Sequence, residues 1–409
     1  MDLKGLFKYL DSLSDEMVQF QKEITAIPAL GPDNGGKGEW DKAMYIKKYM
    51  EEMGLDEVIE VHAPDERAKN GLRPNIIGIY KGKNTEKTVW IMAHTDVVPP
   101  GDMSKWHSDP WTLKVEDGKM IGRGTEDNQQ GLVSSLFAVK ALIDNNVKPE
   151  INIGLVYVAD EETGNKYGLE YVLSQKKDLF KKGDLIIVPD AGEPDSSMVE
   201  VAEKSILWIK FITTGKQCHA STPGAGINAH KANAHLIVKL GELYDKFNLK
   251  DETFDPPIST FEPTKKELNV DNVNTIPGED VFYLDCRILP QYNLEDVLAF
   301  VKEKISEIEE EFNVKIALEF PQKVEAANPT PVDAEVVTKL ISAVKDVYHV
   351  DAKPMGIGGG TVAAEFRKHG YEAAVWSTLE DTCHQPNEYA LISNMVNDAK
   401  VFVHVCLQK

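Results

Sequence analysis

Side chains of the kinds that bind metal ions in proteins are spread along this chain of 409 residues. Five of them form the candidate set: His94, Asp127, Glu162, Asp190 and His384. A mixture of carboxylates and imidazoles suits zinc, cobalt or manganese. Five ligands are more than one closed tetrahedral site needs, so the set fits two metal ions that share a carboxylate. Glu161, directly beside Glu162, would remain free as a base, and this equipment predicts metal-assisted hydrolysis.

Local context bears on His94 and Asp127. His94 and Asp96 form an H-x-D pair at the end of a predicted buried strand, and residues two apart in a strand project to the same side. Asp96 is therefore expected to orient neighbouring groups from behind the ligand. Asp127 precedes a predicted helix, whose positive end favours an ionised carboxylate. Taken alone, each pattern is also common at purely structural positions, such as helix caps.

The paired glutamates follow the apolar segment 151–160, which is predicted to be a buried strand. Because neighbouring side chains diverge at a strand end, either Glu161 or Glu162 can bind a metal while the other holds a water molecule. Asp190 ends the next predicted buried strand, and Glu193 lies close behind it and competes for the ligand role.

His384 lies just beyond the predicted strand 372–378. A single histidine in such a place is usually structural. However, most of the candidate ligands end or closely follow predicted strands, and open α/β sheets place their sites at the carboxyl ends of strands. We therefore expect the candidates to meet in one site.

The first half of the chain alternates predicted strands and helices, which indicates an α/β fold. The strands are 74–82, 88–98, 151–160 and 184–190, and the helices are 131–146 and 167–180. Nearly continuous apolar strands are typical of a parallel sheet covered on both faces. The expected catalytic domain therefore has three layers, αβα, around a mostly parallel sheet.

The pattern changes near Ser205. Predicted strands at 206–215, 272–276, 280–289 and 314–320 and helices at 227–247 and 293–312 follow in the order β-α-β-β-α-β. This order is typical of a ferredoxin-like α+β domain. The helix 334–349 and the strand 372–378 then return to the α/β pattern. We expect a catalytic domain formed by residues 1–205 and 324–409, interrupted by an inserted domain at 206–323.

The net charge of −21 disfavours nucleic acid and anionic membranes as partners. The cysteines, Cys218, Cys286, Cys383 and Cys406, form no CxxC pair, as expected in a reducing compartment. The first residues form an acidic amphipathic pattern rather than a signal peptide. No run of apolar residues has the length of a membrane span. These features predict a cytoplasmic protein.

The motif series identifies a family resemblance. The stretches HTDVVPPGD, GRGTED, ADEETG, VPD and CHQPNEY follow in one order along the chain. In this order they resemble the dinuclear zinc amidohydrolases and peptidases related to acetylornithine deacetylase, succinyl-diaminopimelate desuccinylase and carboxypeptidase G. The resemblance covers nearly the whole chain. It implies that the inserted domain is a lid and dimerisation domain and that the protein is a homodimer.

The resemblance also assigns roles to the candidate residues. His94 would bind one metal ion and His384 the other, with Asp127 bridging both. Glu162 and Asp190 would complete the two sites, and Glu161 would be the general base. A metal-bridging hydroxide would then cleave the C–N amide bond of an N-acyl-amino acid. Zinc is the expected metal, with cobalt or manganese as alternatives, and a dipeptidase or carboxypeptidase with the same centre is the alternative function.

Further residues are assigned to the substrate by the same resemblance. The turn GKQCHASTP contains His219, which in dimeric relatives reaches the partner's active site and stabilises the oxyanion. Asn274 and Arg287 keep the family's spacing and would hold the substrate, with Arg287 pairing a carboxylate. The segment GIGGGT lacks the GK[ST] ending of a phosphate loop. Its backbone at Gly359, Gly360 and Thr361 is expected to face the substrate carboxylate.

The chain departs from the family pattern at three positions. Gln129 stands where a lysine is frequent, Cys218 replaces a small residue before His219, and Ala363 replaces an aspartate of the desuccinylase subgroup. These departures weaken the desuccinylase assignment and leave the metal centre intact. A binding protein without catalytic activity is the alternative from another functional class, and the complete ligand set with Glu161 argues against it.

Relatives also hold the peptide bond after the bridging aspartate cis, which predicts a cis bond between Asp127 and Asn128.

Overall fold

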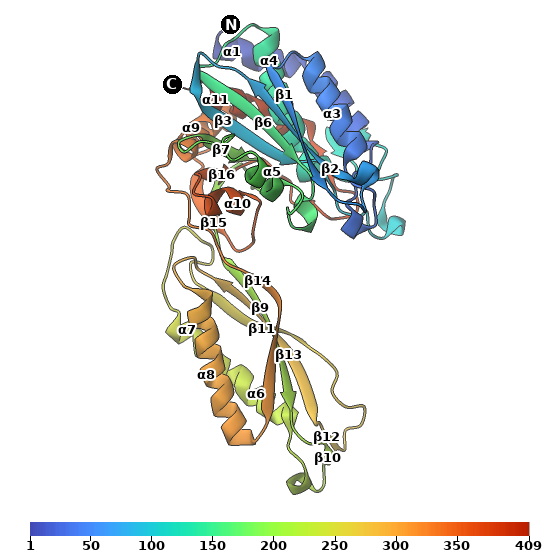
Figure 1. The fold of residues 1–409 in the computed structure, drawn as a ribbon, viewed down its shortest axis with the longest axis vertical. Helices are drawn as coiled ribbons and strands as arrows, with labels where there is room; N and C mark the ends of the chain where they lie inside the picture. Colours follow the sequence, from blue (N-terminus) through green and yellow to red (C-terminus); the bar gives the residue numbers. More distant parts are fainter. Residues whose placement is uncertain (409) are drawn as a thin grey trace. The chain divides into compact units, whose positions relative to one another are not determined.

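The computed structural model describes residues 1–408, which form two compact units (Figure 1). The first unit contains Met1–Val201, Thr330–Pro354 and the chain from Thr361 onward. The second contains Ala202–Pro329 and Met355–Gly360. This last stretch, expected in the catalytic domain, joins the second unit through backbone hydrogen bonds. The Gly356 N–H donates to the Thr253 carbonyl (2.7 Å), and the Ile357 carbonyl accepts from Lys204 (3.0 Å).

A mixed eight-stranded sheet forms the centre of the first unit, in the order β1-β2-β6-β3-β7-β16-β8-β15. The strands are β1 (Glu57–Pro64), β2 (Leu72–Tyr80), β3 (Asn84–His94), β6 (Ile151–Val158), β7 (Leu185–Val188), β8 (Met198–Glu203), β15 (Lys353–Ile357) and β16 (Ala373–Val375). The adjacent strands β6, β3, β7 and β16 run parallel, whereas β1, β2 and β8 pair antiparallel with their neighbours. The prediction of a mostly parallel sheet therefore holds for the central strands. The edge strand β1 was not predicted, because its apolar residues alternate with charged ones.

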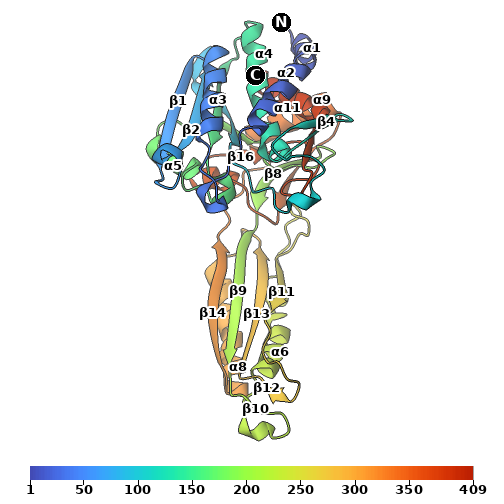
Figure 2. The same ribbon diagram turned by 90° about the vertical axis from the view of Figure 1, so that its right-hand side faces the viewer.

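Helices cover both faces of this sheet and form the expected three layers (Figures 1 and 2). On one face α5 (Leu169–Gln175) and α10 (Ala363–Lys368) pack against alternate side chains such as Trp90 and Met92. On the other face the Tyr157 hydroxyl donates to the Leu132 carbonyl of α4 (3.1 Å). The remaining helices of this unit are α1 (Leu3–Ser12), α2 (Ser14–Thr25), α3 (Trp40–Glu52), α4 (Gly131–Asp144), α9 (Glu335–Tyr348) and α11 (Ile392–Leu407). Among residues 1–408, no helix has both the length and the apolar character that crossing a membrane requires.

A small three-stranded sheet in the first unit joins two distant parts of the chain. It consists of β4 (Lys114–Glu116), β5 (Lys119–Ile121) and β17 (Tyr389–Leu391), in the order β17-β5-β4. The strand β5 shortly precedes Asp127, and β17 shortly follows His384. Their antiparallel pairing therefore brings the loops that carry these two residues together.

The second unit is a four-stranded antiparallel sheet with helices on one face (Figure 2). The strand order β11-β13-β9-β14 and the β-α-β-β-α-β succession confirm a ferredoxin-like α+β fold. The elements are β9 (Ser205–Thr214), α6 (Ala229–Leu240), α7 (Leu243–Lys246), β11 (Thr260–Lys266), β13 (Glu279–Ile288), α8 (Leu294–Phe312) and β14 (Lys315–Val324). Its core lies between the helices and the inward side chains of the sheet, such as Leu207, Phe211 and Phe282.

One predicted strand of the second unit is wrong. Residues 272–276 were expected to supply the second strand, but that place in the sheet belongs to β11. Only β12 (Thr275–Ile276) is extended there, and it pairs with β10 (Cys218–His219) in a separate ribbon. The reason is that β11 is an edge strand with a register shift after Pro263. Proline and exposed charged residues are tolerated at such an edge and hide the strand pattern.

Candidate metal centre

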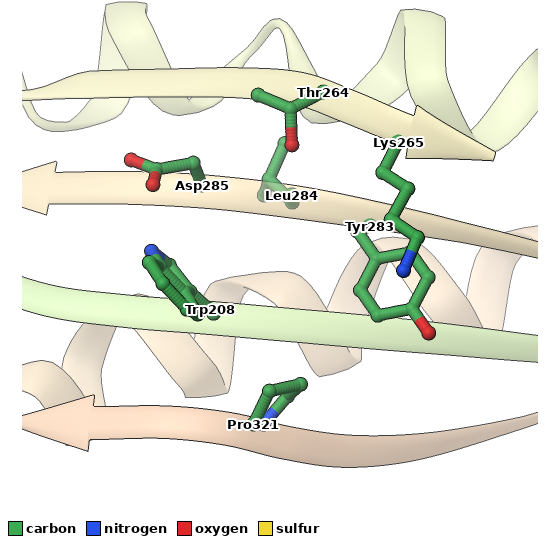
Figure 3. Close-up of a pocket in the computed structure, with 7 residues that line it drawn as sticks. All are labelled: Trp208, Thr264, Lys265, Tyr283, Leu284, Asp285 and Pro321. Carbon is green, nitrogen blue, oxygen red and sulfur yellow. The ribbon is translucent and has the colours of Figure 1, made fainter. Parts of the chain in front are cut away.

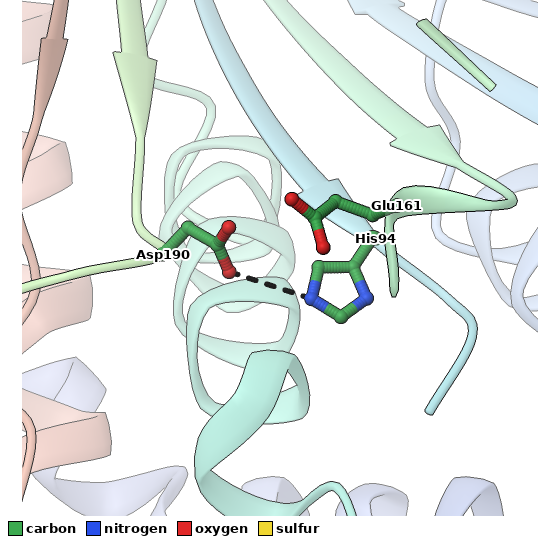
Figure 4. Close-up of side chains that lie close together, drawn as sticks. All are labelled: His94, Glu161 and Asp190. Carbon is green, nitrogen blue, oxygen red and sulfur yellow. Dashed lines mark ion pairs between the residues drawn. The ribbon is translucent and has the colours of Figure 1, made fainter. Parts of the chain in front are cut away.

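The centre of the site is His94, the last residue of β3, whose ring is buried. Its Nε2 atom lies 2.9 Å from Asp127 Oδ1 and 3.4 Å from Asp190 Oδ1. Asp190 follows β7, and Glu161 follows β6, the strands on either side of β3. Figure 4 shows the carboxyl groups of Glu161 and Asp190 approaching the His94 ring from these two strand ends. The parallel centre of the sheet therefore assembles these residues, as its topology predicts.

Asp127 stands between two imidazoles, one on each carboxylate oxygen. While its Oδ1 atom faces His94, its Oδ2 atom lies 3.1 Å from His384 Nε2. The same His384 nitrogen lies 3.1 Å from Glu162 Oε2. The structure therefore brings together all the candidate ligands predicted from the sequence. Of Asp190 and Glu193, it is Asp190 whose carboxylate lies beside His94, while Glu193 belongs to neither candidate metal-binding group among the described residues.

The chemistry of these side chains fits divalent cations. Two groups have ligand atoms within 4.8 Å of one another: His94 with Glu161 and Asp190, and His94 with Asp127 and Glu162. In addition, the buried Oε1 atom of Glu162 has no hydrogen-bond partner among the described residues. A buried carboxylate oxygen without a donor is costly, and a cation would satisfy it. Nitrogen and oxygen donors in this mixture suit zinc, cobalt or manganese.

The carboxylates of the site raise the pKa values of both histidines. Hydrogen bonds with Asp127 and Glu162 raise the pKa of His384 to about 10. Burial opposes the charged form of His94, but the charge of Asp190 and the hydrogen bond with Asp127 raise its pKa well above the usual value. Burial favours a raised pKa for Asp127, yet the hydrogen bonds with both histidines lower it. Both imidazoles therefore face carboxylates that share charge with them.

Glu161 has a different electrostatic environment. Burial and then the negative charge of Asp190 raise the pKa of its carboxyl group well above the usual value. A carboxyl group with a raised pKa can both accept and return a proton near neutral pH. This behaviour distinguishes Glu161 from Asp127, whose carboxylate is held ionised.

Asp96 has the contacts of a positioning residue. Its carboxylate accepts the backbone N–H groups of Glu161 and Glu162, each at 3.1 Å. Its Oδ1 atom also lies 3.4 Å from His94 Nδ1. Asp96 is 1% exposed, so it orients the ligand and the glutamate pair from behind, as expected from the H-x-D pattern.

Glu388 was missed by the sequence reasoning. It is buried and accepts the backbone N–H groups of Gly124, Glu126 and Asp127 at 2.9–3.0 Å, and it pairs with Arg123. Glu388 therefore holds the loop that carries the central carboxylate. The only signal in the sequence was its place inside the CHQPNEY motif.

Two observations concern the residues next to Asp127. The Asp127–Asn128 peptide bond is cis, as predicted, and the Asn128 side chain donates to Asp190 Oδ1 (2.8 Å). Gln129, where relatives often carry lysine, is buried and accepts a hydrogen bond from the Thr25 hydroxyl (2.6 Å). Gln129 therefore belongs to the packing behind the site.

The remaining predicted site residues, apart from Thr361, lie at two places of the second unit. His219 is exposed beside β12, its Nδ1 atom lies 2.7 Å from the Ser221 hydroxyl, and the Asn274 carbonyl accepts from Ala220 (2.8 Å). Towards the other end of the sheet, Arg287 donates to both oxygens of Asp285 (2.8 and 3.1 Å). It also donates to the Gly358 carbonyl (2.9 Å).

The glycine-rich segment is thus tied to Arg287. Gly359 and Gly360 belong to the second unit, and Thr361 resumes the first unit. A side chain at Gly359 would meet no atom within 4 Å in this structure, so its backbone is open to an approaching group.

Comparison with known proteins gives a consistent result. The model of "Peptidase family M20/M25/M40" matches residues 90–408. An uncharacterised metallohydrolase of Methanocaldococcus jannaschii is 43% identical over 408 residues, which cover 96% of this chain and 99% of that protein. The succinyl-diaminopimelate desuccinylase of Nautilia profundicola is 27% identical over 391 residues, which cover 95% of this chain and 98% of that protein.

Solved structures show the same fold. Human carnosine dipeptidase 1 matches with a TM-score of 0.76 at 18% identity, over 99% of this chain and 98% of that one. A Bacillus subtilis protein described as a dinuclear metal binding peptidase from the M20 family matches with a TM-score of 0.66 at 12% identity, over 97% and 98% of the two chains. The resemblance drawn from the motif series is confirmed. The chain belongs to peptidase family M20/M25/M40 and is a metal-dependent hydrolase of amide or peptide bonds.

Proposed function

We propose that this metallohydrolase cleaves the C–N amide bond of N-acyl-amino acids. The observation that carries the proposal is the Asp127 carboxylate placed between His94 and His384, with the half-buried Glu161 beside them. A shared carboxylate flanked by two imidazoles suits two cations, and a neighbouring acid of raised pKa suits proton transfer to an amide nitrogen.

The proposed ligand sets follow the contacts of each histidine. His94 and Asp190 would hold one divalent ion, His384 and Glu162 the other, and Asp127 would bind both. Zinc is the expected ion, with cobalt or manganese as alternatives. Bound ions of this kind polarise an amide carbonyl and lower the pKa of a water molecule.

Glu161 would move the proton. Its carboxylate takes a proton from the attacking water and returns it to the nitrogen of the leaving amine. Asp96 supports this role because it fixes the backbone N–H groups of Glu161 and Glu162. Asp96 therefore restrains the backbone of the turn that carries Glu161.

The second unit would contribute substrate contacts in a homodimer. The Nδ1 atom of His219 is occupied by Ser221, which leaves the Nε2 atom for the carbonyl oxygen of a substrate bound to the partner subunit. Asn274, Arg287 and the backbone of Gly359–Thr361 would hold the substrate, with Arg287 on its carboxylate.

Substrate screening tests the proposal. Protein loaded with zinc, cobalt or manganese is assayed on acetyl- and succinyl-amino acids and, in parallel, on dipeptides. Preferential hydrolysis of the acyl-amino acids is expected. Cleavage of dipeptides alone would replace the proposal by the dipeptidase or carboxypeptidase alternative, which uses the same centre. No turnover with any substrate despite bound metal would refute both.

A further inference from the structure

The helix-free face of the second unit's sheet carries a groove of about 390 Å³. Its lining residues are Trp208, Thr264, Lys265, Tyr283, Leu284, Asp285 and Pro321 (Figure 3). Leu284 belongs to the core on the opposite face of the sheet. Trp208 of β9, Tyr283 of β13 and Pro321 of β14 supply apolar walls. A cavity of this size suits a small-molecule group rather than a protein domain.

Trp208 is the exposed centre of this groove. Its neighbours in β9, Leu207 and Ile209, are fully buried in the core, whereas 39% of Trp208 is exposed. Side chains alternate along a strand, so the indole stands on the face opposite the helices. The Lys265 ammonium lies 4.7 Å from the centroid of the Tyr283 ring, a cation–π contact that stabilises the neighbouring wall. The groove therefore offers aromatic surface beside positive charge.

The strand register places this groove next to Arg287. Asp285 lies directly opposite Trp208, and Arg287 lies opposite Ile206, the residue two positions before Trp208. Arg287 and Trp208 are thus diagonal neighbours on one face, with Cα atoms about 7–8 Å apart. Asp285 links the two, because it lines the groove and accepts both hydrogen bonds from the Arg287 side chain.

Arg287 keeps donors for a ligand. Asp285 takes two of its N–H groups and the Gly358 carbonyl takes a third. A guanidinium group has about five N–H donors, so some remain for a carboxylate. If Arg287 binds the carboxylate of a substrate amino acid, a large side chain of that amino acid can reach the groove.

We propose that the groove around Trp208 receives the side chain of the amino acid whose carboxylate Arg287 holds. The preferred substrates then carry a large apolar or aromatic residue at their carboxyl end. The inference rests on the proposed function, since it takes Arg287 as the carboxylate-binding residue. It names the substrate class within that function and makes Trp208 its specificity determinant.

The test measures kcat/KM on N-acetyl-alanine, N-acetyl-leucine and N-acetyl-phenylalanine. Wild type is expected to prefer phenylalanine. Trp208→Ala should lose about tenfold on the phenylalanine substrate, which corresponds to about 1.4 kcal/mol, and change little on the alanine substrate. Trp208→Phe should retain most of the preference. Val238→Ala, at a residue that is 78% exposed on α6, controls for truncation of a surface side chain and should behave like wild type.

Three results would overturn the inference. A Trp208→Ala variant that loses activity equally on all three substrates shows that the groove does not select side chains. If that variant also changes oligomeric state in sedimentation experiments, the face is an interface between copies of the chain. An active wild type without preference for large side chains refutes the inference alone, whereas a metal-loaded wild type inactive on all acyl-amino acids and dipeptides refutes the proposed function as well.

Discussion

At the scale of residues, Glu161 occupies an ambiguous position. It follows the same strand as Glu162, and it forms a possible metal-binding group with His94 and Asp190. Burial raises the pKa of Glu161 and that of Glu162 alike, so the pKa values do not assign the roles of proton carrier and metal ligand. Substitution of the two glutamates separates these roles.

Glu161→Gln is expected to reduce kcat by roughly a hundredfold to ten-thousandfold, the usual contribution of a general acid–base group, while the protein keeps its bound metal. Glu162→Gln should lose metal instead, because it removes a charged oxygen from the contact with His384. Steady-state kinetics and elemental analysis of both variants check this. Loss of metal in Glu161→Gln would make Glu161 a ligand.

His384 gives the metal affinity a pH dependence. In the metal-free protein its hydrogen bonds with Asp127 and Glu162 raise its pKa to about 10, and only the neutral imidazole binds a metal ion. Binding at neutral pH must therefore release a proton, and apparent affinity should rise by about tenfold per pH unit below the pKa. Calorimetry in buffers of different ionisation enthalpy measures the released protons. Binding without proton release would contradict the raised pKa.

At the scale of elements, the turn that carries the glutamate pair is held from behind by Arg73 of β2. Arg73 is fully buried and pairs with Glu39, the residue before α3. Its Nη2 atom lies 3.3 Å from Asp160 Oδ1. Asp160 directly precedes Glu161 and adopts a positive φ of 63°. Its carboxylate also accepts the Tyr167 backbone N–H (3.0 Å). The conformation of the turn thus depends on a buried charge network.

Arg73→Met is expected to destabilise the protein by about 3–5 kcal/mol, because it leaves buried carboxylates without a partner. Lys345→Met is the matched control, since it removes a cation from an exposed pair with Asp351 and should leave the stability nearly unchanged. Denaturant unfolding of the two variants gives the comparison. Equal stabilities would show that the network around Arg73 is dispensable.

The sequence predicted the elements and the side chains that gather at the candidate site better than the contacts that connect distant parts of the chain. The ligand candidates were recognisable because residues such as His94 and Asp190 end apolar strands. The pair of Arg123 with Glu388 joins residues 265 positions apart, and neither side chain belongs to a periodic pattern. Long-range buried pairs of this kind depend on the packing of the finished fold. The same applies to β11. Its strand conformation depends more on pairing within the sheet than on its own apolar residues.

At the scale of the whole molecule, the candidate metal centre lies in the first unit, whose residues supply all its candidate ligands. A ligand that binds only the folded state stabilises it. Removing metal with a chelator should therefore increase hydrogen exchange at the end of β3, in residues 124–128 and in the turn Glu161–Thr163. The core of the second unit, including Phe211 and Phe282, should keep its protection. Uniform loss of protection in both units would show that they unfold together.

The short stretch Met355–Gly360 has a consequence for how the chain tolerates change. It belongs to the second unit, although the residues before it, Thr330–Pro354, and those after it belong to the first. Its Gly358 carbonyl is a fixed partner of Arg287. Excising residues 202–329 as an independent domain would therefore leave Arg287 without this partner, so transplanting the domain requires grafting the distant loop along with it.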